Sequence, residues 1–501
     1  MQGTSLGAKA RGGLAWAAAS VVLTLVLQLG FGAVMARLLD PATFGLVAMA
    51  MVALRLFSYL SQIGLSMTVG AMQRQSMTDD DLRLSLGVVC AASAVSISAT
   101  WLLAPLAASF FDKPAVVPLL RVLAFSLLLQ GLAHVSVSLL RRQLRFRSLA
   151  VLEMLAYALG YGCLGVWAAL AGWGAWSLVA ATFGQATLSL GLAYACTRHT
   201  LLPRWRGAGA GHWRYGARHT VISFTEFLSA NMDSLLIGRL AGDTALGLYN
   251  RAHVLVHQPM ERAASIFTRV LFPVVAVIQH ERARVGGLFV LGIGVIGLLA
   301  GVVSLSVSAA AADVVALLLG PRWSDAVPVV QLLALAVPVI FMSNIAGILC
   351  DAMDLLRFKL KLQLCGMALV LGLMLGLSPY GMLGIVAGLV IGESLRLVAY
   401  VYFLADHLQY RRRDALRVLT VVFLSAGSAA LAVRAAMNFG QAQGWPLPLR
   451  LLLETSAGAA LLALGLLSLV WVLRPTLAGD LARGQVPGWR QIEAVLLRAR
   501  P

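Results

Sequence analysis

Charged residues are scarce in this sequence. Asp, Glu, Lys and Arg together make up 12% of the 501 residues, whereas hydrophobic residues make up 60%. A soluble globular domain carries about 25% charged residues, so the shortage excludes a soluble protein. Apolar runs of about 20 residues or more recur along the chain, and each can cross a hydrocarbon core of about 30 Å. Backbone groups in lipid must bond within their own segment, so the sequence predicts an all-α polytopic membrane protein.

Signatures of catalysis and of metal binding are also missing. No G-x-x-x-x-G-K-[ST] loop is present, which argues against an ATPase within this chain. The five cysteines are an odd number and lie in or beside apolar runs, which argues against a disulfide framework or a metal site. No predicted outer loop is long enough to build a catalytic site. We therefore expect no enzyme, no metal and no cofactor, and leave open a coupling H⁺ or Na⁺.

Positive charge is abundant relative to negative charge, with a formal net charge of +18. In a soluble protein this excess would suggest nucleic acid as a partner. Here the basic residues lie mainly in short loops between apolar runs, where they orient helices, so we expect no nucleic acid partner. Most of them fall on one side of the predicted membrane. This bias predicts that both termini lie in the cytoplasm.

The chain contains an internal duplication. Residues 36–50 read ARLLDPATFGLVAMA and residues 238–252 read GRLAGDTALGLYNRA. At this offset of 202, Arg37 matches Arg239 and Gly45 matches Gly247. Near the fourth and tenth apolar runs the offset becomes 210, as small loop insertions would produce. Six helices per half is an even number, so both halves enter the membrane in the same sense.

The duplication and about fourteen apolar runs predict five segments along the chain. These are an N-terminal six-helix lobe (1–200), a basic cytoplasmic linker (201–218), a C-terminal six-helix lobe (219–405), two extra transmembrane helices (406–474) and a cytoplasmic tail (475–501).

Ionisable side chains inside the apolar runs are candidates for a functional cavity, because a charge in lipid usually faces water or a partner. One face of the run 246–272 carries Asn250, His253, His257 and Glu261 at helical spacing, with Pro259 predicted to kink the helix. At offset 202 Arg55 matches His257, and at offset 210 His134 matches Asn344. Matching polar positions suggest a shared interior, although hydrogen bonds that hold helices together are an alternative.

Three candidate pairs of ionisable residues admit a purely structural interpretation. Glu393 and Arg396 are spaced i,i+3 and can form an ion pair within one helix. Asp233 can pair with Arg251, or Glu226 with His257, and such pairs would only lock helices together. A stripe of Gly384, Gly388 and Gly392 is suited to close helix packing.

The segments Asp233–Leu240, Ala245–Ala252 and Ala36–Leu46 resemble the polysaccharide transporter family. These are the Wzx-type lipid-linked oligosaccharide flippases of the multidrug/oligosaccharidyl-lipid/polysaccharide exporter superfamily. The resemblance covers roughly residues 10–475. It implies two pseudo-symmetric six-helix lobes around a central cavity, two C-terminal helices, and rocking between inward-open and outward-open states. It also implies a bacterial inner-membrane location and a lipid substrate, undecaprenyl-pyrophosphate-linked oligosaccharide.

The resemblance also implies partners and gives the polar residues their expected roles. Membrane lipids, a polysaccharide polymerase and chain-length or export proteins are the implied partners. Arginine suits phosphate oxygens, and carboxylates with histidine suit a proton or Na⁺. The expected substrate-binding residues are Arg55, Gln62, His134, His257, Asn344 and Arg396, and the expected coupling-ion residues are Glu226, Asp233, His253 and Glu261.

Two other functions remain open at this point. A cation-coupled exporter of small drugs shares the superfamily fold and predicts twelve helices with fewer arginines in the cavity. A membrane polymerase or ligase of polysaccharide assembly would need a large outer loop, which the sequence does not offer.

Overall fold

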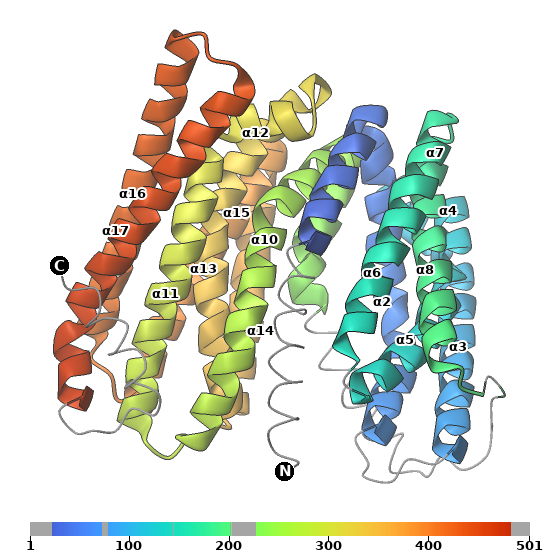
Figure 1. Cartoon of the computed structure of the whole chain (residues 1–501), viewed down its shortest axis with the longest axis horizontal. Coiled ribbons are helices and arrows are strands. Elements are labelled where there is room, and N and C mark those ends of the chain that lie inside the picture. Colours follow the sequence, from blue (N-terminus) through green and yellow to red (C-terminus); the bar gives the residue numbers. More distant parts are fainter. Residues whose placement is uncertain (1–22, 73–78, 144, 201, 203–226, 482–501) are drawn as a thin grey trace. The chain divides into compact units, whose positions relative to one another are not determined.

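The computed structural model describes residues 23–72, 79–143, 145–200, 202 and 227–481. These residues form helices and no strands (Figure 1). Eleven of the described helical segments are long and apolar enough to cross a membrane. The prediction of an all-α polytopic membrane protein is confirmed, and the count of about fourteen spans stays a prediction.

The helices run in chain order as follows. The first half contains the helix Leu23–Leu38, α2 (Pro41–Met72), α3 (Asp79–Phe111), α4 (Val116–Ala124), α5 (Ser126–Arg142), α6 (Phe146–Ala156), the π-helical η1 (Tyr157–Leu164), α7 (Gly165–Leu170) and α8 (Ala175–Thr197). The second half contains a helix at 227–240, α10 (Gly242–Val277), α11 (Arg282–Ala309), α12 (Ala311–Leu318), η2 (Pro321–Ala326), α13 (Val327–Ala352), α14 (Leu356–Gly376), η3 (Ser378–Tyr380), α15 (Gly381–Leu408), α16 (Arg412–Ala442) and α17 (Leu447–Leu481).

The chain divides into two compact units. Unit 1 comprises the described residues up to Leu255 together with Ala312–Val330 and Leu371–Leu389. Unit 2 comprises Val256–Ala311, Gln331–Val370 and the described residues from Val390 onward. The units follow packing rather than sequence repeats, so the predicted lobe boundaries stay a prediction. The linker 201–218 and most of the tail 475–501 lie outside the described residues, apart from residues 202 and 475–481.

Local sequence sets where the helices of unit 1 begin. Asp40 caps α2, because its carboxylate accepts a hydrogen bond from the Thr43 backbone N–H at 2.8 Å, and Pro41 takes the first helical position. The hydrogen bonds from Thr43 hold the pKa of the Asp40 carboxyl below its ordinary value. Within unit 1, α2 packs against α3 and α5, and α5 packs against α8.

Glycines allow several helices to approach closely. A Cβ on Gly388 of α15 would lie 2.7 Å from the backbone nitrogen of Met374, and one on Gly392 would lie 2.7 Å from the Val370 side chain. Both neighbours belong to α14, so the packing role predicted for this glycine stripe is confirmed at these two positions. In unit 2, α11, α16 and α17 pack together, with Gly465 of α17 against Leu298 of α11.

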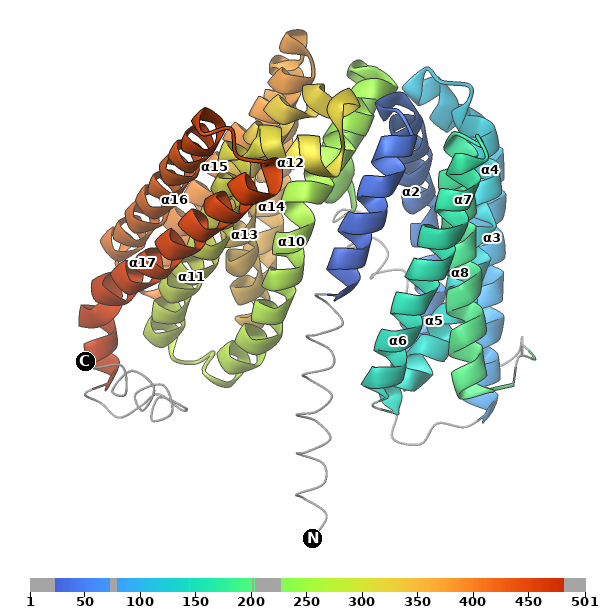
Figure 2. The same ribbon diagram turned by 45° about the horizontal axis from the view of Figure 1, so that its top comes forward.

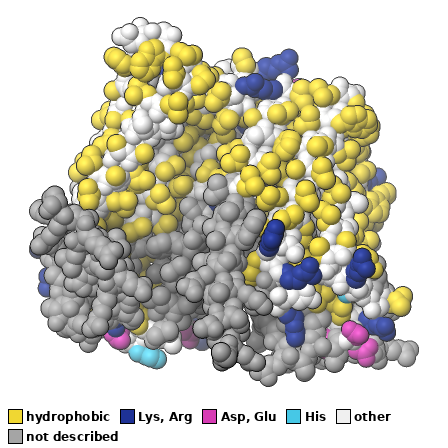
Figure 3. Space-filling view, in the orientation of Figure 1, with side chains coloured by type: hydrophobic (Ala, Val, Ile, Leu, Met, Phe, Trp, Pro, Cys, Tyr) yellow, Lys and Arg dark blue, Asp and Glu magenta, His cyan; other side chains and the backbone are white. Residues whose placement is uncertain are grey.

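Apolar side chains cover the outer surface of the described helices. Leu102 of α3 is 79% exposed, and Leu424 and Leu431 of α16 are about as exposed. On the face drawn in Figure 3, hydrophobic side chains cover most of the described surface. Such a surface would be unstable in water and is stable against lipid chains.

The two duplicated turns pack directly against each other inside unit 1. A Cβ on Gly45 would overlap the carbonyl oxygen of Asp243, and a Cβ on Gly247 would overlap the carbonyl oxygen of Pro41. At the offset of 202, Gly45 matches Gly247 and Pro41 matches Asp243. The same contact is therefore made twice, once in each direction, and only glycine permits the approach.

A second pair of reciprocal contacts involves the matched arginines. Arg37 donates a hydrogen bond to the Leu317 carbonyl of α12 at 2.6 Å, and Arg239 donates to the Ser109 carbonyl of α3 at 3.5 Å. Each arginine thus reaches from the turn of one repeat to a helix end of the other. Figures 1 and 2 both draw α12 beside the start of α2.

A third pair joins the loops that follow these helix ends. Trp323 donates through its indole nitrogen to the Ala36 carbonyl at 2.7 Å, and Lys113 forms an ion pair with Asp243 at 2.9 Å. Trp323 and Lys113 are separated by 210, the second repeat offset. We call this set of contacts, around residues 36–45, 109–113, 238–247 and 317–323, the repeat junction. The repeat junction includes the starts of α2 and α10, the helices that carry Arg55 and His253.

Candidate translocation site

The candidate site in unit 1 is built on Asp233 of the 227–240 helix and Tyr249 of α10. Tyr249 is 1% exposed and donates its hydroxyl to the Asp233 carboxylate. The other carboxylate oxygen accepts the backbone N–H of Ser234 at 2.6 Å. Asp233 is therefore held between a phenol and a backbone amide. The Arg251 guanidinium lies over the Phe44 ring, 3.9 Å from its centre. The pair of Asp233 with Arg251 that the sequence offered stays a prediction.

His253 extends this cluster. The imidazole of His253 lies beside the ring of Tyr249, with centroids 6.0 Å apart. Arg55 lies in α2 and is exposed. Among the described residues, no acid forms an ion pair with Arg55. Two predicted residues, Asp233 and His253, are thus brought together around Tyr249.

Unit 2 groups another set of predicted residues. His257 of α10 lies against Phe341 of α13, with ring centroids 5.0 Å apart. Asn344, one turn after Phe341 on the same face, is exposed although it lies within an apolar helix. Glu261, one turn after His257, is also exposed. α10 continues as one helix through Pro259, and the kink there stays a prediction.

Arg396 and Glu393 form the ion pair that the sequence offered as a structural alternative. Their charged atoms are 2.5 Å apart, and Glu393 is 6% exposed. The Arg396 side chain crosses Gly366 of α14, where a Cβ would lie 2.9 Å from its Cδ. This arrangement balances the charge of a carboxylate in an apolar helix. A role for Arg396 in binding substrate stays a prediction.

The remaining predicted residues are separate from these groups or outside the described side chains. His134 of α5 is half-buried and lies 3.4 Å from the Ser138 hydroxyl on the next turn. Gln62 lies in α2, but its side chain lies outside those described. Glu226 lies outside the described residues. Their roles stay predictions.

Sequence reasoning missed Tyr249, Trp323 and Lys113. Tyr249 follows the duplicated turn and reads as an ordinary core residue until its hydroxyl is placed on Asp233. Trp323 and Lys113 occupy matching positions but share no chemistry, so identity within the repeat does not reveal them. Their spacing of 210, the offset of the neighbouring helices, was the available signal.

A family comparison bears directly on this arrangement. The model of the family described as "Polysaccharide biosynthesis protein" matches residues 34–328, which include both duplicated turns. This chain belongs to that family. The resemblance drawn from Asp233–Leu240 and Ala36–Leu46 is therefore confirmed.

Three known proteins are similar to this chain over part of their length. The lipopolysaccharide biosynthesis protein WzxC of Escherichia coli is 26% identical over 66% of this chain and 67% of its own length. The succinoglycan biosynthesis transport protein ExoT of Rhizobium meliloti is 27% identical over 64% of this chain and 65% of its own. The teichuronic acid biosynthesis protein TuaB of Bacillus subtilis is 29% identical over 55% and 58%. The chain thus spans about two thirds or less of these relatives.

Two solved structures of membrane transporters have a fold similar to that of this chain. The lipid II flippase MurJ, in an inward closed conformation, has a TM-score of 0.68 at 10% identity, covering 90% of this chain and 99% of that chain. A multidrug resistance MATE family transporter of the MOP superfamily, in an inward-facing conformation, has a TM-score of 0.59 at 15% identity, covering 77% and 94%. At these identities the likeness concerns the fold.

Proposed function

We propose that this protein is a flippase. It moves undecaprenyl-pyrophosphate-linked oligosaccharide units from the cytoplasmic to the periplasmic leaflet of a bacterial inner membrane, for exopolysaccharide or lipopolysaccharide assembly. Membership in the polysaccharide biosynthesis family supports the pathway. The similarity to WzxC and ExoT supports a transport role within it.

The observation that carries the mechanism is the repeat junction. Gly45 and Gly247 make the same contact in two directions, and Lys113–Asp243 and Trp323–Ala36 are held at matching loops. Such paired contacts can form or break together, because each repeat supplies half of them. In our proposal the junction closes one end of the translocation path and opens when substrate passes. Alternating access requires such a reversible closure.

The physical need for a polar path follows from the substrate. A prenyl tail is stable in the bilayer, but moving an ionised pyrophosphate through hydrocarbon costs tens of kcal/mol on a Born estimate. Arg55 of α2 is an exposed cation within a membrane-crossing segment. In the proposed mechanism Arg55 lines a wet path and contacts phosphate, whereas His253 belongs to the proposed coupling-ion group. A negative headgroup moving outward gains about 2.3 kcal/mol per charge per 100 mV of membrane potential.

The deciding experiment uses the purified chain in vesicles. A fluorescent polyprenyl-pyrophosphate oligosaccharide is placed in one leaflet, and its arrival in the other is measured by a lectin or glycosidase that cannot cross the membrane. We expect flipping well above protein-free vesicles. A dye-efflux assay in parallel tests the drug-exporter alternative. Efflux of organic cations without movement of the lipid-linked sugar would replace the flippase proposal with that alternative.

A further inference from the structure

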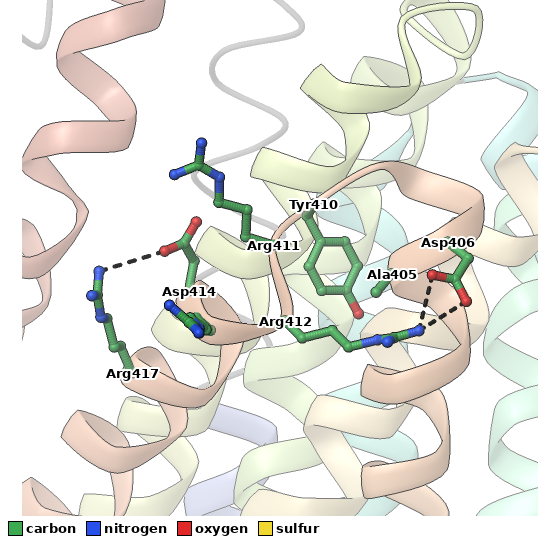
Figure 4. A pocket seen from close by; sticks show the side chains of 8 residues that line it. Ala405, Asp406, Tyr410, Arg411, Arg412, Asp414 and Arg417 are labelled. Carbon is green, nitrogen blue, oxygen red and sulfur yellow. Dashed lines mark hydrogen bonds and ion pairs between the residues drawn. The ribbon is translucent and has the colours of Figure 1, made fainter.

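The loop between α15 and α16 forms a basic cavity within unit 2. Its volume is about 530 Å³ (Figure 4). It is lined by Ala405, Asp406, Tyr410, Arg411, Arg412, Arg413, Asp414 and Arg417. Four arginines and two aspartates thus line the cavity. None of these residues belongs to the candidate translocation site.

Two of the four arginines are occupied. Arg412 donates to both carboxylate oxygens of Asp406 at 2.9 Å, and its guanidinium lies 4.0 Å from the centre of the Tyr402 ring. Arg417 lies 3.7 Å from the carboxylate of Asp414. These pairs fix the walls of the cavity. Both acidic residues of the cavity are therefore already paired with arginines.

Arg411 and Arg413 supply the remaining charge. Both are exposed, and neither forms an ion pair with any residue that the structure describes. In Figure 4 the Arg411 guanidinium points away from the two ion pairs that are drawn. The cavity therefore carries two positive charges in excess, from side chains that suit phosphate oxygens.

The backbone adds to this preference for anions. α16 begins at Arg412, and its cap residue Arg411 makes no side-chain hydrogen bond to the first turn. The first N–H groups of a helix lack partners within the helix and carry partial positive charge. Tyr410 is fixed beside them, because its hydroxyl donates to the Val401 carbonyl at 2.5 Å. The cavity thus combines a held wall, helix N–H groups and two uncompensated cations.

The position of the cavity beside lipid-facing helices indicates which class of ligand fits it. It lies between the membrane-crossing segments Ser378–Leu408 and Arg412–Ala442, at the polar end of both. Directly beyond it these helices expose apolar side chains, including Val398 at 61% and Leu416 at 58%. A ligand with a phosphate group and a hydrocarbon tail matches both surfaces. A soluble anion would use only the first.

We propose that this cavity binds the phosphate headgroup of a membrane lipid through Arg411 and Arg413. Anionic phospholipid and a polyprenyl diphosphate carry the same phosphate chemistry at the same depth. The proposal does not depend on the flippase function, since either lipid occupies the cavity without crossing the membrane.

The test measures lipid binding to the purified full-length chain in phosphatidylcholine nanodiscs. Tail-labelled phosphatidylglycerol, polyprenyl diphosphate and phosphatidylcholine are titrated separately. We compare Arg411→Gln/Arg413→Gln with a matched control, Arg282→Gln/Arg357→Gln. The control residues are exposed arginines in the first turns of α11 and α14, and the control makes the same charge change. Melting temperature and gel filtration verify that each variant is folded.

We expect Arg411→Gln/Arg413→Gln to weaken binding of at least one anionic lipid by about thirtyfold, because both arginines line the cavity that holds the headgroup. The control should weaken binding little, because Arg282 and Arg357 do not line this cavity. Loss of phosphatidylglycerol identifies a structural phospholipid, and loss of polyprenyl diphosphate alone identifies the carrier lipid. Displacement by millimolar inorganic phosphate would show that the phosphate group itself is recognised. Equal losses in both double variants, an equal loss for phosphatidylcholine, or unchanged binding of both anionic lipids would overturn the proposal.

Discussion

Gly45 and Gly247 sit at the centre of a reciprocal contact. A Cβ on Gly247 would lie 3.0 Å from the backbone nitrogen of Gly45 and would also overlap the Pro41 carbonyl. The two glycines occupy matching positions of the sequence repeat. The duplicated turn therefore packs on its own copy, and a side chain larger than hydrogen at either position has to push the turns apart.

The first prediction concerns these glycines. Gly45→Ala or Gly247→Ala should destabilise the repeat junction by about 1–3 kcal/mol, because the added methyl has no space. The measurement is thermal unfolding of the purified chain together with its rate of lipid-linked oligosaccharide flipping. Gly30→Ala is the matched control, since nothing lies within 4 Å of its Cβ position in the same unit. If Gly45→Ala and Gly30→Ala unfold and transport alike, the close contact is not maintained in the membrane.

The second prediction concerns opening of the junction. Lys113→Cys/Asp243→Cys, in a chain whose five native cysteines are replaced by serine, should stop flipping when the pair is cross-linked and recover on reduction. The native side chains meet at 2.9 Å, so a short link bridges the positions. Glu281→Cys/Arg284→Cys is the control, because that pair lies within one repeat at the start of α11. Full transport by the cross-linked Lys113/Asp243 pair would mean that the junction does not open during the cycle.

The third prediction tests Arg55 and Arg396, two arginines within membrane-crossing segments, by separate substitutions. Arg55→Ala should block polymer export at normal expression, and Arg55→Lys should restore it only in part, because lysine keeps the charge but loses the fork. The measurement is exported polysaccharide per unit of protein in the membrane. Normal export by Arg55→Ala would remove this residue from the proposed path.

For Arg396 the ion pair changes the design. Arg396→Ala removes the cation of the buried Glu393–Arg396 pair, and breaking a buried pair costs about 3–5 kcal/mol. Glu393→Gln/Arg396→Gln removes both charges and should restore stability. If this double variant also restores export, Arg396 serves structure alone; if export stays lost in a stable protein, Arg396 contacts substrate.

The fourth prediction concerns coupling at Asp233. We expect Asp233→Asn to retain substrate binding and to lose the response of flipping to an imposed cation gradient, because the amide cannot bind a proton or Na⁺ as the carboxylate does. Tyr249→Phe should alter that response, since it removes the hydroxyl that Asp233 accepts. The control is Thr244→Val, on the exposed start of α10. A full response by Asp233→Asn would exclude this cluster as the coupling site.

Several features of the molecule are determined by the sequence alone. The scarcity of charge and the recurrence of apolar runs predict membrane helices. In lipid the backbone N–H and C=O groups find no water, so each apolar segment must satisfy them internally as a helix. The match between residues 36–50 and 238–252 reveals the duplication without any structure. The same segments indicate the family. These features are local or periodic, and periodic patterns are readable along a chain.

Which polar side chains meet was decided only by the tertiary structure. Helical spacing correctly placed His253 and His257 on one face of α10, but it could not show that Tyr249 reaches Asp233 or that Arg251 lies over Phe44. It also could not choose between substrate binding and an ion pair for Arg396, which the structure shows against Glu393. Nor could it show that Lys113 pairs with Asp243 and that Trp323 donates to the Ala36 carbonyl. Spacing along one helix fixes a face, whereas the neighbour of that face is set by packing between segments far apart in the chain.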